Sequence, residues 1–377
     1  MARAIASADL ATRDDGFRIV FHSIGGAAPG NAAAIAIGLG VPVTPVMEAL
    51  YRAPSVLVDG LNAEIGERMR ALLTDMGCRV TLDPMTAPLP APAPLQDAAL
   101  HITDTARYGA ITSALAEFLG TPGEDAARLI ATPPGIVLGG VSPATIAALA
   151  ERIGPGADLV ASDPAHALYD LFLGPCDGIT RSRLFSDLRR AGFKPLADAG
   201  CILTGLTKTQ ADAVWAAHGR VRDLRVVNRD FLRFDLVLTG GAPSPAATRA
   251  LIETAGIPAH VVPRLFDEGE ITVMEALLHA DMAPAMERLT AAGLEIRADL
   301  VTFLHLGVDI VAAQHPRALR DTLKAIGIET TESDLRRLPY RLPWRLPELQ
   351  ARLLRDTLEA AGARTELVDV TDTEAHP

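Results

Sequence analysis

The chain contains a long internal repeat. The stretch "APSVLVDGLNAEIGERMRALLTDMGCRVTLDP" (residues 53–84) and the stretch "PPGIVLGGVSPATIAALAERIGPGADLVASDP" (133–164) both predict a strand, a helix and a second strand, and both end in Asp-Pro. Many positions match at an offset of 80, among them Pro54 with Pro134 and Gly60 with Gly140. Because such a constant offset is the mark of a repeat architecture, we interpret this part of the chain as a duplicated domain.

Each copy predicts the same order of elements. A strand near Phe17 precedes a helix that breaks at Gly40, and a short second helix leads to a strand ending at Gly60. The next helix, Asn62 to Met76, has apolar residues at helical spacing, with Asn62 as its N-cap (Ser142 in the second copy) and Gly77 after its end. A last strand completes a β-α-α-β-α-β unit of about 70 residues, a size close to the lower limit for a domain that folds alone.

Weaker copies of this unit occupy the rest of the chain. The expected fold class is α+β, a tandem array of about five small domains, each a three-stranded antiparallel sheet packed against helices. The third copy is shorter and is expected to have lost or trimmed one helix. The five predicted domains are residues 14–85, 96–165, 166–230, 231–302 and 303–372.

Composition excludes some classes of protein. The chain has 46 acidic and 35 basic residues, a balance that disfavours binding to nucleic acid or to anionic membranes. Three widely spaced cysteines, Cys78, Cys176 and Cys201, form neither a disulfide framework nor a metal-binding pair, which suits a reducing compartment. The N-terminal residues lack a signal-peptide core and the most apolar stretch is interrupted by glycines and prolines, so we expect a cytoplasmic protein without a membrane span.

No motif nominates a chemical centre. The nine histidines show no metal-ligand spacing, and the Gly-rich turns such as "SIGGAAPGN" lack the Gly-Lys-Ser/Thr of a phosphate-binding loop. Cys78 and Cys201 lie in apolar runs typical of buried thiols, and Asp104 and Asp177 are better interpreted as helix caps. The sequence therefore predicts no catalytic residue, no cofactor and no metal, although an enzyme with a site between repeats stays an alternative.

The segment "DLRRLPYRLPWRLPEL" (334–349) combines residue types that are frequent at protein interfaces. Prolines at four-residue spacing exclude a regular helix and favour an extended form. One interpretation is the middle strand of the fifth repeat, with leucines inward and arginines outward. The other is a contact for a protein partner with an acidic and apolar surface, made by Arg337, Tyr340, Arg341, Trp344 and Arg345, with Arg341 and Arg345 expected to face outward.

The first copy resembles the C-terminal domain of the bacterial ribosomal stalk protein, large-subunit protein seven/twelve. The resemblance rests on the Gly38-Leu39-Gly40 helix break, on Ala53-Pro54 and on the spacing from Pro54 to Gly60 and Gly77. It covers the first copy well, the second fairly and the others in outline, and it implies a fold that the Clp protease adaptor shares. The stalk domain recruits translational GTPases through basic residues on its first two helices, whereas residues 31–47 here carry no charged residue.

These observations favour a non-enzymatic interaction scaffold, or an accessory subunit of a larger complex, because repeated small domains multiply binding surface without a chemical centre. An adaptor for translational GTPases or for an AAA protease is the second hypothesis that the resemblance implies.

Overall fold

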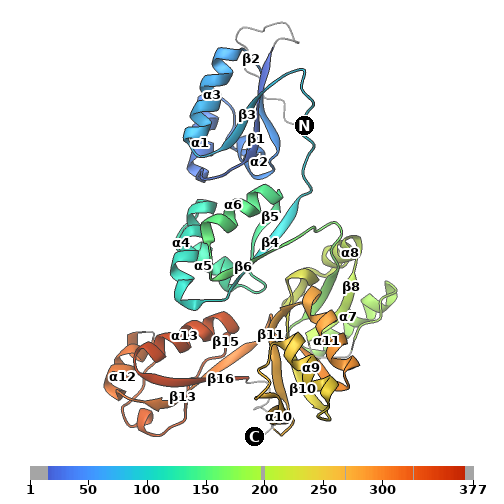
Figure 1. Cartoon of the computed structure of the whole chain (residues 1–377), viewed down its shortest axis with the longest axis vertical. Helices are drawn as coiled ribbons and strands as arrows, with labels where there is room; N and C mark the ends of the chain where they lie inside the picture. Colours follow the sequence, from blue (N-terminus) through green and yellow to red (C-terminus); the bar gives the residue numbers. More distant parts are fainter. Residues whose placement is uncertain (1–15, 197–199, 268, 326, 370–377) are drawn as a thin grey trace. The chain divides into compact units, whose positions relative to one another are not determined.

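The computed structural model describes residues 16–196, 200–267, 269–325 and 327–369. The outermost residues of the first and fifth predicted domains, 14–15 and 370–372, lie outside these ranges. The chain divides into two compact parts, Met1–Ala165 and His166–Pro377. Within the described residues, five small antiparallel sheets follow one another along the sequence, which confirms the expected α+β array (Figure 1).

The first part contains two repeats of the same topology. Repeat one consists of β1 (Phe17–Ser23), α1 (Pro29–Leu39), α2 (Val43–Tyr51), β2 (Ser55–Leu61), α3 (Ala63–Asp75) and β3 (Arg79–Pro84). Repeat two consists of β4 (Gln96–Ile102), the 3-10 turn η1 (Thr105–Arg107), α4 (Tyr108–Leu119), α5 (Gly123–Ala131), β5 (Ile136–Val141), α6 (Pro143–Ile153) and β6 (Ala157–Ser162). In both sheets the first strand is central, with the second and third strands as its antiparallel neighbours.

The second part contains three more sheets with the same strand order. Repeat three is β7 (Tyr169–Leu173), α7 (Gly178–Arg190), β8 (Gly200–Leu206), α8 (Lys208–His218) and β9 (Leu224–Asn228), with one helix fewer than its neighbours among the described residues. Repeat four, after the turn η2 (Arg229–Phe231), is β10 (Arg233–Gly241), α9 (Pro245–Ala255), α10 (Val262–Leu265), β11 (Ile271–Leu278), α11 (His279–Ala291) and β12 (Leu294–Leu300). Repeat five is β13 (His305–Ala313), α12 (Pro316–Ala325), η3 (Asp334–Arg336), β14 (Tyr340–Arg341), β15 (Leu346–Pro347), α13 (Glu348–Ala360) and β16 (Ala363–Asp369).

Local sequence explains where the helices begin and end. Helices α1 and α4 end at Gly40 and Gly120, whose φ angles of 64° and 65° are left-handed and cost glycine little. The Asn62 side chain accepts the amide of Ile65 and caps α3 as expected. Ser142 occupies the N-cap of α6 but its hydroxyl does not cap the helix; it lies 3.3 Å from the hydroxyl of Thr145.

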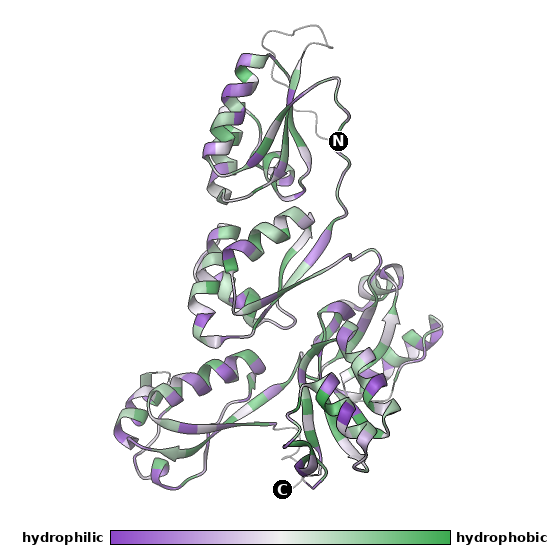
Figure 2. Ribbon diagram, viewed as in Figure 1, coloured by the Kyte–Doolittle hydropathy of each residue, from purple (hydrophilic) through white to green (hydrophobic). Residues whose placement is uncertain are grey.

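Each repeat buries apolar side chains between its sheet and its helices. In repeat one these include Ile19, Phe21, Leu50 and Leu73, and separate clusters fill repeats three, four and five. The hydrophobic residues gather on the central strands, while the helices carry both hydrophobic and hydrophilic residues along their length (Figure 2). Each repeat therefore has its own small core, as expected of separate domains in series.

The edge strand next to each central strand carries the same irregularity. In every sheet, four residues of the edge strand lie opposite two residues of the central strand, as residues 57–60 lie opposite Arg18 and Ile19 in repeat one. The first of the four is always a buried apolar residue: Leu57, Val137, Ile202, Val273 or Leu342. The last has a positive φ angle in the first four repeats: Gly60, Gly140, Gly205 and Ala276. A shared β-bulge of this kind relates all five sheets and bends the edge strand at one place.

A carboxylate of the central strand fixes this bulge in repeats two to four. Asp97, Asp170 and Asp235 accept the main-chain amides of Gly140 (2.9 Å), Gly205 (2.8 Å) and Ala276 (2.7 Å), respectively. Repeat one has Arg18 at this position, and its guanidinium donates to the carbonyls of Ala87 and Pro88 in the segment after β3. Repeat five has Gly307 there, so no side chain of that position can hold the bulge.

Repeats one and two are joined by a polar interface. The carbonyl of Tyr51, at the end of α2, accepts the amide of Ser142 and the hydroxyl of Thr145, both at 2.9 Å. At the other end of α6, Arg152 donates to the carbonyls of Gly25 (2.9 Å) and Ala27 (2.5 Å). Ser142 and Thr145 are completely buried, so one face of α6 is the docking face of repeat two on repeat one.

Candidate protein-binding surface on the fifth repeat

The Arg- and Pro-rich segment forms the edge strand of repeat five. Tyr340 and Arg341 pair with Ile310 and Asp309 of β13, and Leu346 and Pro347 pair with Leu306 and His305. The segment is therefore the middle strand of repeat five in sequence order, lies beside the central strand β13, and occupies the position that β2 has in repeat one. Residues 342–345 are the bulge, in which four residues lie opposite two of the central strand, as in the other edge strands.

The five candidate residues do not form one continuous strip. Tyr340 is half-buried and packs against the apolar core of repeat five, on the same side as the buried Leu342. Arg337, directly after η3, is exposed, as are Trp344 and Arg345 in the bulge. The structure therefore divides the segment into an inner apolar side that stabilises repeat five and an outer side that carries Arg337, Trp344 and Arg345.

Arg341 is engaged within the repeat. Its Nε and one Nη donate to the two carboxylate oxygens of Asp309, both at 2.8 Å, and this pair raises the pKa of Arg341 above its ordinary value. The position of Asp309 in the central strand is occupied in the other repeats by apolar residues: Val20, Ala99, Phe172 and Val237. Arg341 does not simply face outward as expected from the sequence, since one edge of its guanidinium is fixed to the sheet.

Trp344 and Arg345 occupy the last two positions of the bulge, where the fold common to the repeats does not require a large side chain. The corresponding pairs in the other repeats are Asp59-Gly60, Gly139-Gly140, Thr204-Gly205 and Glu275-Ala276. Trp344 is 36 % exposed, although an indole is among the most favourable side chains to bury. An aromatic residue and an arginine at the bend of a bulged edge strand are well placed to meet another molecule.

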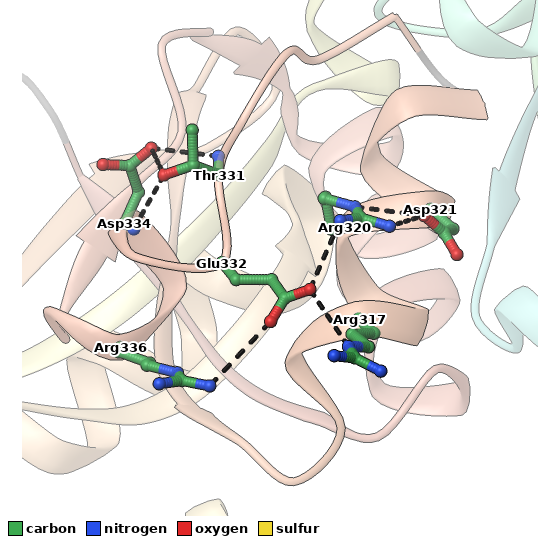
Figure 3. Close-up of polar contacts among 7 residues, drawn as sticks. All are labelled: Arg317, Arg320, Asp321, Thr331, Glu332, Asp334 and Arg336. Carbon is green, nitrogen blue, oxygen red and sulfur yellow. Dashed lines mark hydrogen bonds and ion pairs between the residues drawn. The ribbon is translucent and has the colours of Figure 1, made fainter.

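A second group of arginines lies on the helical side of repeat five. Glu332 accepts from Arg317 (3.2 Å) and Arg320 (3.3 Å) of α12 and lies 3.8 Å from Arg336 of η3 (Figure 3). Arg320 also donates to Asp321 at 2.8 Å. Three guanidinium groups offer about fifteen N–H donors, far more than one carboxylate and a neighbour accept, so donors remain for an acidic ligand.

Sequence reasoning missed this arginine cluster and its organiser, Glu332. The positions Glu332 and Arg336 at i, i+4 were a local signal for an ion pair, but the link from Glu332 to α12 depends on the tertiary fold. Near this cluster, hydrogen bonds from the hydroxyl and the amide of Thr331 lower the pKa of Asp334, and the positive charge of Arg337 lowers it further. Residues 303–347 hold seven basic and five acidic side chains, in a chain that is acidic as a whole.

The side chains and the turn that the sequence analysis considered as possible chemical groups have structural roles in the fold. Cys78 is buried, and desolvation raises the pKa of its thiol to about 11. Asp104 and Asp177 accept amides at the starts of η1 and α7, as caps do. The Gly-rich turn after β1 is filled by its own chain, since the amide of Gly26 donates to the carbonyl of Gly77 at 3.0 Å. Over the described residues, no group of three or more His, Cys, Asp or Glu side chains is arranged to hold a metal ion.

Fold and surface together define a multidomain protein of repeated small α+β domains with an arginine- and tryptophan-bearing edge on the fifth. No family model matches the chain, and no curated protein or solved structure is significantly similar to it. No helix in the described part of the chain is both long and apolar enough to cross a bilayer.

Proposed function

We propose that the protein is a non-enzymatic interaction scaffold, or the accessory subunit of a larger complex, whose repeats are related to the ribosomal stalk C-terminal domain. The repeats keep one framework and differ in their surfaces, which is how tandem domains acquire different partners. In this proposal the protein works in the cytoplasm and binds protein rather than nucleic acid, in accordance with its excess of acidic residues.

The exposed Trp344 at the bulge of repeat five carries the proposal. The other four bulges have a small or acidic residue at this position, so the framework does not require the indole. Arg337 and the cluster around Glu332 add cations near the same segment of sequence. Aromatic residues and arginines dominate binding energy at protein interfaces, and arginine pairs with carboxylates through two parallel hydrogen bonds. The partner in this proposal therefore presents carboxylates beside an apolar pocket.

A paired set of variants tests the proposal. Full-length tagged protein is purified from its native host as wild type, as Arg337→Glu/Trp344→Asp, and as the control Arg222→Glu/Trp215→Asp, which alters an exposed arginine and an exposed tryptophan of repeat three. We expect one stoichiometric protein partner with wild type and control, and its loss with the first variant. Affinity should fall about 30-fold or more, since two hot-spot residues contribute about 2 kcal/mol or more.

Two results contradict this proposal. One is retention of the same partner by the Arg337→Glu/Trp344→Asp variant, which places the contact elsewhere. The other is a stoichiometric metabolite or cofactor in the purified protein, which favours an enzyme with a site between repeats.

An adaptor for translational GTPases or for an AAA protease is a second candidate, and one observation favours it. The first helix of repeat five carries Arg317, Arg320 and Lys324, whereas α1 of repeat one has no charged residue. Helix α12 therefore offers cations where the resemblance implies a basic face, as does the first helix of repeat three, α7, which carries four arginines. If the full chain accelerates GTP hydrolysis by a translational GTPase and the Arg317→Glu/Arg320→Glu variant does not, this candidate replaces the general scaffold.

A further inference from the structure

Helix α12 of repeat five presents a row of basic side chains. Arg317, Arg320 and Lys324 follow one another at i, i+3 and i+7 and therefore share one side of the helix. Leu319 and Leu323 are buried in the core of the repeat and fix how the helix is rotated. Arg317 and Lys324 are exposed and Arg320 is half-buried, so the row lies at the surface, where a ligand can reach it from solvent.

A hydrogen-bonded turn places Glu332 against this row. The amide and the hydroxyl of Thr331 donate to Asp334 at 3.0 and 2.6 Å, and the amide of Asp334 donates back to that hydroxyl at 3.2 Å. Leu335 is buried and anchors η3, which follows the turn. Glu332 thereby points toward α12, and Arg336 approaches it from η3 (Figure 3). The fold thus gathers three guanidinium groups around one point, which lowers the cost of ordering them around a ligand.

Glu332 holds these arginines loosely. Its Oε1 accepts from Arg317 Nε at 3.2 Å and from Arg320 Nη1 at 3.3 Å. Arg336 Nη2 lies 3.8 Å from Oε2, beyond hydrogen-bonding distance. Charge-assisted hydrogen bonds are ordinarily about 2.7–2.9 Å long, and both bonds of the ion pair between β14 and β13 measure 2.8 Å. Each guanidinium of the cluster meets Glu332 through a single nitrogen, so its paired donors remain for a better acceptor.

A phosphate monoester fits this cluster better than a carboxylate does. The three arginines and Lys324 carry four positive charges against two carboxylates, Glu332 and Asp321, the second of which is bound to Arg320 at 2.8 Å. The excess of two charges matches a phosphate monoester, which carries about −1.5 to −2 at pH 7 and three strong acceptor oxygens. A carboxylate has only two oxygens, and one oxygen of Glu332 already serves two arginines.

We propose that this cluster binds a phosphate monoester, whose phosphoryl group takes the place of the Glu332 carboxylate and bonds to Arg317, Arg320 and Arg336. The ligand is the phosphorylated side chain of another protein or a small phosphorylated compound, since both present the same group. A nucleic-acid phosphodiester carries a single charge, so it matches the cluster less well. This inference goes beyond the proposed function, because it requires neither Trp344 nor a stable protein partner.

Fluorescence anisotropy on the full chain tests the ligand class. The probe is a labelled short peptide of alanine and glycine around one phosphoserine, and its control has glutamate in place of the phosphoserine. At low salt, wild type should bind the phosphopeptide in the millimolar range or more tightly, and the glutamate peptide at least about tenfold more weakly. Equal binding of the two peptides, or binding of neither, overturns the proposal.

Inorganic phosphate, added as a competitor of the bound probe, separates the two sources of ligand. Displacement at concentrations close to the Kd of the phosphopeptide supports a site for a small phosphorylated compound. Displacement only at concentrations about tenfold higher supports a site for a phosphorylated side chain, because the peptide then contributes binding energy of its own.

Two variants with opposite effects test the role of Glu332. Arg317→Gln/Arg336→Gln removes two exposed guanidinium groups and should weaken phosphopeptide binding at least about tenfold, with the far-UV circular dichroism of wild type. Glu332→Gln removes the carboxylate that competes for the site and should strengthen binding about fivefold, because only weak, exposed ion pairs held that carboxylate. Unchanged binding by the double variant, or binding by Glu332→Gln no tighter than that of wild type, overturns the proposal.

Two controls separate this site from other arginines and from the proposed protein contact. Arg297→Gln alters an arginine of repeat four that is already bonded to two carboxylates, and it should bind the phosphopeptide as wild type does. Trp344→Asp alters the edge strand of repeat five and should also bind as wild type does. Loss of phosphopeptide binding in either control overturns the assignment of the ligand to the cluster around Glu332.

Discussion

Replacing Arg229 with methionine should destabilise repeat three selectively. Arg229 donates to Asp170 through Nε (3.1 and 3.2 Å) and Nη2 (2.6 Å), and the side chains of Asp170 and Arg229 are only 7 % and 17 % exposed. Removing one partner of a buried ion pair costs about 3–5 kcal/mol, because the other charge stays buried without compensation. Asp170 keeps the amide of Gly205, so we expect the lower end of this range, about 3 kcal/mol.

Hydrogen exchange on the full chain measures this loss repeat by repeat, which global unfolding of a multidomain protein does not. Amides of β7 and β9 should exchange about 100-fold faster in Arg229→Met, while those of β1 and β3 should not change. The double variant Asp170→Asn/Arg229→Met removes both charges and should recover part of the protection. Unchanged exchange in β7, or an equal change in β1, would refute the reasoning that this pair stabilises repeat three.

Three further outcomes follow from the structure. Arg341→Glu sets a second carboxylate beside Asp309 and should lower the stability of repeat five by about 2 kcal/mol or more, measured as faster exchange in β13, with no such change in Arg222→Glu. Cys78, with its thiol pKa raised to about 11, stays protonated at pH 8 and should resist iodoacetamide in the native protein, so rapid alkylation there contradicts its burial. Arg152→Ala removes two hydrogen bonds between repeats one and two and should weaken their docking by about 2 kcal/mol, so unaltered exchange at the Ser142 amide would exclude a role for Arg152.

The architecture could be predicted because its signals are local and repeated. The glycine breaks at Gly40 and Gly120, the cap at Asn62 and the constant offset of 80 depend on short-range geometry that the sequence states directly. The shortened third repeat could be predicted for the same reason, since the missing helix leaves too few residues between its strands.

The arrangement of side chains at the surface could not be predicted in the same way. That Arg341 binds Asp309 depends on the register of β14 on β13, which a sequence of alternating leucines and arginines does not fix. Ile65 and Leu72 have the spacing of core-facing residues in a helix, yet they are 47 % and 55 % exposed, because α3 packs on its sheet through Gly66 and Leu73. Both cases depend on contacts between residues far apart in sequence.

Site-specific photo-crosslinking tests the central claim, that the edge of repeat five recruits a protein partner, most directly. A benzophenone amino acid replaces Trp344 in the full chain in its native host, and a second strain carries it in place of Trp215, which is 50 % exposed on α8 of repeat three. The account predicts a single crosslinked protein, rich in acidic residues, with the probe at position 344 and not with the probe at position 215. No crosslink at 344, or the same crosslinked species from both positions, would contradict it.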